Sequence, residues 1–133
     1  MKILIADDEF TSRKILMKIM EPFGECDIAC NGKEAWDAFQ FAHKEGRSYD
    51  ILLLDIIMPE MDGRQVLTKI REYEKAKNLH GSKALRIAMA TTLGDKESVI
   101  TSFRDQCDGY MVKPYFRDSL LENLRNNGIL PAS

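Results

Sequence analysis

The stretch Ile51-Leu52-Leu53-Leu54-Asp55 decides the fold, because four apolar residues in a row are followed directly by an acid. A run of this length is typical of a strand, and it has no polar face. Both faces of such a strand must be covered, which favours a central strand of a parallel sheet with helices on either side. Asp55 would then lie at the carboxyl end of a buried strand.

Shorter apolar runs and amphipathic stretches alternate on both sides of this strand. They predict further strands at residues 3–5, 27–30, 85–90 and 110–112. They predict helices over residues 11–23, from Asn31 to near Gly46, around 66–70, over 96–104 and around 120–124. Strands joined through helices run parallel with right-handed crossovers. Five βα units therefore predict an α/β fold with a doubly wound five-stranded parallel sheet, in the flavodoxin-like strand order 2-1-3-4-5.

Composition favours one ordinary domain over residues 1–133, with no separate effector domain. Because 44% of the residues are hydrophobic, a core of ordinary size can be buried. The formal net charge is −2, so we expect no direct nucleic-acid or membrane binding. No apolar run approaches a membrane span, and the N-terminus lacks the features of a signal peptide. The three cysteines show no Cys-x-x-Cys spacing, which indicates reduced thiols in a cytoplasmic protein.

Polar residues that could share one site follow four of the predicted strands. They are Asp7 and Asp8 after the first strand, Asp55 after the third, Thr91 after the fourth and Lys113 after the fifth. Ligands of open α/β sheets bind outside the carboxyl ends of the strands, so we expect the three acids to share a pocket. Carboxylates packed together repel unless a cation joins them, and oxygen ligands suit Mg²⁺. A lysine and a threonine on the opposite rim then predict Mg²⁺-assisted phosphoryl transfer, with Asp55 as nucleophile.

Each of these residues has a simpler interpretation when it is taken alone. An acidic run after a strand is usually a solvated loop, and Asp62-Gly63 is most often only a turn. The joint arrangement, with every residue at the correct strand end, carries the prediction.

The chain resembles the response-regulator receiver domain (the CheY-like family) of two-component signalling over essentially its whole length. The marks of the resemblance are Asp7-Asp8, Asp55-Ile56-Ile57-Met58-Pro59, Asp62-Gly63, Thr91 and Tyr110-Met111-Val112-Lys113-Pro114-Tyr115. The resemblance implies a stand-alone phosphoacceptor switch rather than a turnover enzyme, limited to self-catalysed phosphotransfer and autodephosphorylation. Its donor would be a histidine kinase or a histidine phosphotransfer protein, and its output would be a downstream protein target.

The resemblance also implies individual roles. Asp55 would accept the phosphoryl group. Mg²⁺ would be bound by Asp8, Asp55 and the backbone carbonyl of Ile57, with Asp7 acting mainly through water.

On the other rim, Lys113 would pair with the phosphoryl oxygens, and the Lys113-Pro114 peptide would be cis. The resemblance makes Thr91 and Tyr110 the switch residues. They would act on the face formed by the fourth helix, the fifth strand and the fifth helix, with Lys96, Arg104 and Arg117 on or near it.

The chain departs from the family pattern at several positions. Thr92 stands where a small residue is usual, and Gln106-Cys107 where Gly-Ala is common. Ile57 and Leu93 are apolar at positions that tune hydrolysis of the acyl phosphate in the family. Because an apolar rim admits water poorly, we predict a long-lived phosphorylated state.

Other classes of protein share parts of this pattern. A phosphatase of the haloacid-dehalogenase type needs a second Asp two residues after the nucleophile, where this chain has Ile57. A flavodoxin-like nucleotide or flavin binder needs a phosphate-cradling loop where this chain has acids. A degenerate receiver that only makes protein contacts would not need every key residue. Among receivers, a chemotaxis-type motor regulator and a phosphorelay shuttle both stay open, and the apolar rim slightly favours the second.

Overall fold

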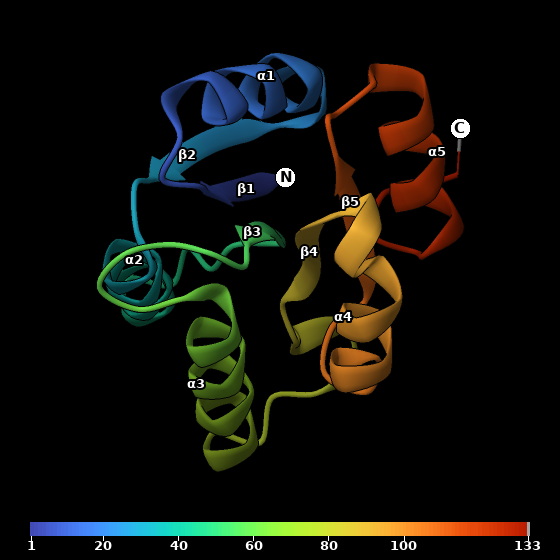
Figure 1. The fold of residues 1–133 in the computed structure, drawn as a ribbon. Helices are drawn as coiled ribbons and strands as arrows, with labels where there is room; N and C mark the ends of the chain where they lie inside the picture. Colours follow the sequence, from blue (N-terminus) through green and yellow to red (C-terminus); the bar gives the residue numbers. More distant parts are fainter. Residues whose placement is uncertain (133) are drawn as a thin grey trace.

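The computed structural model of the chain describes residues 1–132 and has a five-stranded parallel sheet at its centre (Figure 1). The strands are β1 (Lys2–Ala6), β2 (Glu25–Ala29), β3 (Ile51–Asp55), β4 (Arg86–Thr92) and β5 (Gly109–Lys113). Their order is β2-β1-β3-β4-β5, and every neighbouring pair is parallel. The predicted doubly wound fold and its strand order are confirmed.

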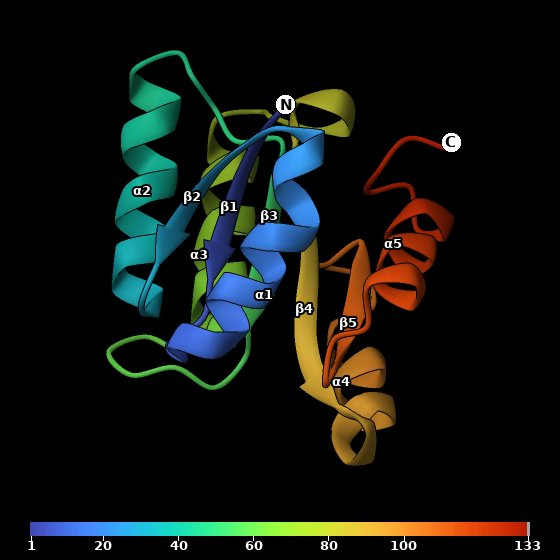
Figure 2. The same cartoon turned by 90° about the horizontal axis from the view of Figure 1, so that it is seen from above.

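Five helices cover the two faces of this sheet (Figures 1 and 2). They are α1 (Phe10–Met20), α2 (Gly32–Lys44), α3 (Gly63–Ala76), α4 (Lys96–Phe103) and α5 (Arg117–Asn126). Short 3₁₀ turns occur at η1 (Glu21–Phe23), η2 (Gly81–Lys83) and η3 (Leu93–Asp95). Helices α1 and α5 pack on one face, and α2, α3 and α4 pack on the other.

The side chains of the central strand β3 pack into both apolar layers of the core. Leu52 and Leu54 belong to the core beneath α2 and α3, whereas Ile51 and Leu53 belong to the core beneath α1 and α5. All four side chains are at most 1% exposed. The unbroken apolar run is therefore the pattern that a strand covered on both faces requires.

Several element boundaries differ from the prediction. Helix α1 ends at Met20 rather than at Phe23, because Pro22 cannot continue the α-helical hydrogen bonds and lies instead in η1. Strand β2 begins at Glu25 and ends at Ala29, and helix α4 ends at Phe103. Strands β4 and β5 each run further than predicted, so Thr91 and Lys113 are still paired within the sheet. That pairing anchors both backbones firmly.

The starts of α2 and α3 are capped by side chains. Asn31 Oδ1 accepts from the backbone N–H of Glu34 at 2.8 Å, which confirms the predicted start of α2. Asp62 accepts from the backbone N–H of Gln65 while the Gln65 side chain accepts from the backbone N–H of Asp62. Asp62-Gly63, for which a turn was the simpler interpretation, instead forms the start of α3, with Asp62 as the cap and Gly63 as the first helical residue.

None of the helices in residues 1–132 has the length and apolar character that a membrane span requires.

Candidate functional site

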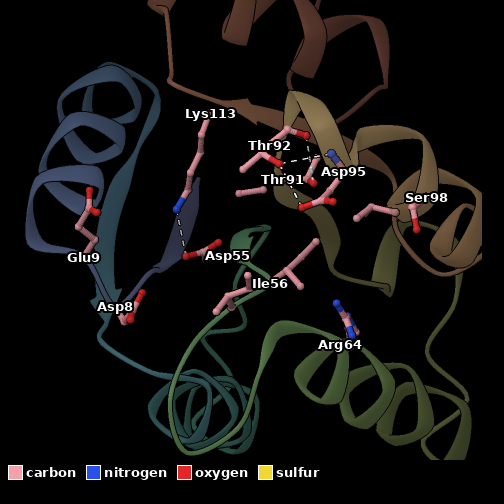
Figure 3. Close-up of a pocket in the computed structure, with 13 residues that line it drawn as sticks. Asp8, Glu9, Asp55, Ile56, Arg64, Thr91, Thr92, Asp95, Ser98 and Lys113 are labelled. Carbon is pink, nitrogen blue, oxygen red and sulfur yellow. Dashed lines mark hydrogen bonds and ion pairs between the residues drawn. The ribbon is translucent and has the colours of Figure 1, made fainter.

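A cavity of about 360 Å³ opens at the carboxyl edge of the sheet, where β3 and β4 end (Figure 3). Buried residues form its floor, and exposed residues from the loops and from the starts of α3 and α4 form its mouth. The lining comprises Asp8, Glu9, Asp55, Ile56, Ile57, Arg64, Ala90, Thr91, Thr92, Asp95, Ser98, Val99 and Lys113. The sheet thus brings most of the predicted site residues into one pocket.

The backbone around Asp55 is held in place by the turn that follows β3. Asp55 pairs with Ala90 of β4, and its side chain is only 8% exposed. The backbone N–H of Gly63 donates to the carbonyl of Ile56 at 2.7 Å, so α3 begins directly beside the end of β3. A Cβ at position 63 would overlap the carbonyl oxygen of Asp55, so only glycine permits this close packing. The backbone that carries the Asp55 carboxylate is therefore held in position by strand pairing and by the start of α3.

Lys113 connects the fifth strand to the acids of the first and third strands. Its Nζ lies 3.1 Å from Oδ2 of Asp55 and 3.4 Å from Oδ2 of Asp7. The Lys113-Pro114 peptide is cis, as the sequence predicts. The ammonium group therefore stands beside the nucleophile predicted from the sequence.

Asp7, Asp8 and Asp55 form an acidic cluster, since each offers a carboxylate oxygen within 4.8 Å of the others. Asp7 is fully buried, and its Oδ1 accepts from the backbone N–H of Glu9 at 2.9 Å. Its Oδ2 accepts no hydrogen bond from residues 1–132, and Nζ of Lys113 lies 3.4 Å from it. A buried carboxylate oxygen without a hydrogen bond, facing two other carboxylates, fits a hard divalent cation that takes oxygen ligands. The residues present therefore suit Mg²⁺.

The charges of the cluster shift the pKa values of its members. Burial and the carboxylate of Asp7 raise the pKa of Asp55, although Lys113 opposes this change. Burial alone would lower the pKa of the Lys113 ammonium, but its ion pairs with Asp55 and Asp7 outweigh burial and raise it. Lys113 is therefore charged at neutral pH. The negative charge of Asp55 is unfavourable beside the other carboxylates, and a second cation would reduce this repulsion.

The two predicted switch residues lie in different surroundings. Thr91 lines the pocket and is 6% exposed, and its hydroxyl makes only a long hydrogen bond of 3.4 Å to the carbonyl of Thr92. Tyr110 does not line the pocket. Its hydroxyl donates to the carbonyl of Ile100 at 3.3 Å, which ties β5 to α4.

Ile57 and Leu93, the two apolar residues predicted to tune hydrolysis, are both exposed, but only Ile57 lines the cavity. Ile57 is part of the lining and is 77% exposed. Leu93 is 75% exposed on η3 and lies outside the lining. Thr92 faces the pocket, and its hydroxyl caps η3 by accepting from the backbone N–H of Asp95 at 3.3 Å.

The sequence interpretation missed three polar residues at the mouth of the pocket, namely Arg64, Asp95 and Ser98. Arg64 belongs to the first turn of α3, two residues after the Asp62 cap. The capping pattern of Asp62 and Gln65 could have placed a helix start, and so Arg64, beside Asp55. Asp95 and Ser98 follow Thr91 closely in the chain, but only the fold of η3 and α4 brings them to the mouth.

Comparison with known proteins agrees with this geometry. The family model described as "Response regulator receiver domain" matches residues 3–125. A "Chemotaxis protein CheY homolog" of Campylobacter jejuni is 33% identical over 128 residues, which cover 95% of this chain and 91% of that protein. The "Transcriptional regulatory protein SrrA" of Staphylococcus aureus is 36% identical over 115 residues, covering 86% of this chain and 42% of the longer protein. The crystal structure of a CheX-CheY-BeF₃-Mg²⁺ complex from Borrelia burgdorferi has a TM-score of 0.77 at 29% identity, covering 94% of this chain and 87% of that chain.

The chain belongs to the response regulator receiver domain family. It is a receiver domain of the CheY-like type found in two-component signalling, so the resemblance seen in the sequence is confirmed.

Proposed function

We propose that this chain is a switch that accepts a phosphoryl group on Asp55 in a Mg²⁺-dependent reaction with a phosphohistidine donor. The observation that carries the proposal is the pairing of a fixed, buried carboxylate with a lysine 3.1 Å away in an open cavity. The donor would be a histidine kinase or a histidine phosphotransfer protein. Support for the metal comes from the acidic cluster, and from the BeF₃ and Mg²⁺ in the complex of the Borrelia burgdorferi relative.

Different residues of the chain would perform different parts of the transfer. An oxygen of the Asp55 carboxylate attacks phosphorus while the bond to the leaving group breaks in line with it. Mg²⁺, held by Asp8, Asp55 and the Ile57 carbonyl with Asp7 behind them, would supply positive charge to the phosphoryl oxygens. Lys113 is already paired with Asp55 and can move its ammonium group to the oxygens of the new acyl phosphate.

The added charge would then change the pocket wall formed by β4 and α4. A phosphoryl group brings extra negative charge and strong acceptor oxygens. Thr91 has a hydroxyl available to donate, because its present hydrogen bond is long. Movement of Thr91 toward the phosphoryl group would disturb α4, which Tyr110 links to β5. The face of α4, β5 and α5 is the proposed output surface for a downstream protein target.

The test is incubation with Mg²⁺ and acetyl phosphate, followed by intact mass spectrometry. Wild type should gain one phosphoryl group, and Asp55→Asn should gain none. Omission of Mg²⁺ should prevent the gain in wild type. Exposed Asp105, which lies outside the pocket, provides the matched control, and Asp105→Asn should react as wild type does. A wild type that gains no mass, or an Asp55→Asn variant that does, would overturn the proposal.

The lifetime of the phosphorylated state depends, in this proposal, on the apolar rim. Ile57 and Leu93 offer no group that could hold an attacking water, so hydrolysis should be slow. The double variant Ile57→Asn with Leu93→Glu should lose its phosphoryl group faster than wild type. Ile28 is 48% exposed on the distant edge strand β2, and Ile28→Asn serves as the control. Equal lifetimes for the double variant and wild type would show that the rim does not control hydrolysis.

A further inference from the structure

The mouth of the pocket contains a cation that the proposed transfer does not use. Arg64 is exposed in the first turn of α3 and lines the same cavity as Asp55. Figure 3 shows its guanidinium pointing from α3 toward the mouth, across from Asp95 and Ser98. Within residues 1–132, this guanidinium makes no hydrogen bond and no ion pair with another side chain.

The other cations close to the acids are already engaged. Lys113 is paired with Asp55 and Asp7 on the opposite side of the nucleophile from Arg64. The Arg13 side chain donates to the backbone carbonyl of Asp7 at 2.9 Å and does not line the cavity. Arg64 is thus the cation of the lining that is free to meet an incoming group.

In the proposed transfer, the leaving group would lie on the side of the phosphoryl group that faces the mouth of the pocket, where Arg64 is. Asp55 and Thr91 lie at the buried floor, while Arg64, Asp95 and Ser98 are exposed at the mouth. Because attack and departure are in line, a leaving group on a phosphoryl held against the floor extends toward the mouth. The residues that line the mouth include Asp95, whose carboxylate would repel a departing anion, and Arg64, whose guanidinium would attract it.

We infer that Arg64 is a specificity-determining residue that favours small acyl phosphates, whose leaving group is a carboxylate, as phosphodonors. The inference rests on the proposed function. In transfer from an acyl phosphate, the new bond joins an Asp55 oxygen to phosphorus. The bond from phosphorus to the acyl oxygen breaks, and the carboxylate leaves with the electron pair. A guanidinium can bind that developing carboxylate through two parallel hydrogen bonds.

Phosphodonors with a P–N bond differ from acyl phosphates because their leaving group is neutral. In phosphoramidate the nitrogen is already protonated, so the P–N bond breaks and neutral ammonia leaves. A phosphohistidine whose other ring nitrogen carries a proton likewise releases neutral imidazole. These leaving groups give Arg64 no anion to stabilise, so its removal should matter much less for them.

The experiment compares rates of Asp55 phosphorylation by acetyl phosphate, carbamoyl phosphate and phosphoramidate, at saturating Mg²⁺ and low salt. From the strength of a single partly exposed charge pair, Arg64→Gln should slow both acyl phosphates by about 3- to 10-fold and phosphoramidate by less than about 2-fold. Arg64→Lys, which keeps the charge but not the planar fork, should fall between wild type and Arg64→Gln. The preference of wild type for acyl phosphates should shrink as salt rises, because salt screens exposed charges.

The control removes the same charge elsewhere. Arg47 is exposed and pairs with Glu25 at 3.7 Å, away from the cavity. Arg47→Gln should leave the ratio of acetyl phosphate to phosphoramidate rates unchanged. An equal slowing of all donors by Arg64→Gln, or no slowing of any, would overturn the inference while leaving the proposed function intact. A wild type that no donor phosphorylates would instead overturn the proposed function.

Discussion

Replacement of Asp55 by Asn should stabilise the metal-free protein at neutral pH. The carboxylate oxygens of Asp7, Asp8 and Asp55 lie within 4.8 Å of one another, and Asp55 is 8% exposed. At that separation and an effective dielectric constant near 20, a pair of like charges costs about 3 kcal/mol. Lys113, 3.1 Å from Asp55, offsets much of this repulsion. We therefore expect Asp55→Asn to raise the free energy of unfolding by about 1–2 kcal/mol at pH 7 without metal.

The pH dependence of this gain follows from the raised pKa of Asp55. The folded state holds the Asp55 proton more tightly than the unfolded state does. Wild type should therefore gain stability as pH falls through the folded pKa toward the unfolded value of about 4. Asn carries no charge at any pH, so its advantage should be largest at pH 7 and should disappear near pH 4.

Mg²⁺ should reverse the order of the two proteins. Metal at 100 times its dissociation constant stabilises the folded state by about 2.7 kcal/mol. Wild type should gain this amount, whereas Asp55→Asn, which lacks one ligand charge, should gain much less.

The assay is urea unfolding at pH 7 and pH 4, with EDTA or with Mg²⁺. Asp105→Asn, an exposed change outside the cluster, should alter the free energy of unfolding by less than about 0.5 kcal/mol. If Asp55→Asn in EDTA at pH 7 unfolds at the same or a lower urea concentration than wild type, the charge of Asp55 does not destabilise the metal-free protein. A gain in stability as large at pH 4 as at pH 7 would show that the gain does not come from removal of that charge.

Two further predictions concern packing contacts outside the acidic cluster. A Cβ at Gly32 would overlap the carbonyl oxygen of Met61, so Gly32→Ala should cost about 1–3 kcal/mol in urea unfolding. Gly94→Ala, where the added Cβ has nothing within 4 Å, should cost less than about 0.5 kcal/mol, and equal costs would contradict this explanation. Asp108 accepts from Arg71 at 3.1 Å at the amino end of β5, so Asp108→Ala should cost about 1–3 kcal/mol. Acetyl phosphate should phosphorylate the Asp108→Ala variant at the same rate as wild type. A large fall in that rate would show that the two ends of the sheet are coupled.

The sheet and most of the pocket could be predicted from the sequence because both depend on local patterns. The apolar run that ends in Asp55 requires a strand covered on both faces, and alternation with helices requires parallel neighbours. The carboxyl ends of parallel strands meet at one edge, which places Asp7, Thr91 and Lys113 near Asp55 without further information. These residues belong to the strands or follow them directly, so small errors in strand boundaries did not matter.

The mouth of the pocket could not be predicted in the same way. Arg64 reaches it only because α3 begins against the carbonyl of Asp55, which depends on the missing side chain of Gly63. That contact is tertiary, and a single Asp-Gly pair has the same appearance in a surface turn. The early end of α1 at Met20 shows a different limit, because an apolar pattern continues past Pro22 although the helical hydrogen bonds do not.

The two sides of Asp55 differ in how closely their backbones are packed. On the β3 side, Gly63 packs against the backbone of Asp55 and Ile56, and Gly32 packs against the backbone of Met61, so the two ends of this loop are closely packed. On the β4 side, Gly94 has open space around it, and Val99 is the one residue of α4 that is buried. Under the proposed function, a phosphoryl group on Asp55 would therefore act more easily toward α4 than toward the loop after β3. Because most of α4 faces solvent, a downstream protein that bound there would contact the loosely packed side of the site directly and would not need to reach the acid cluster.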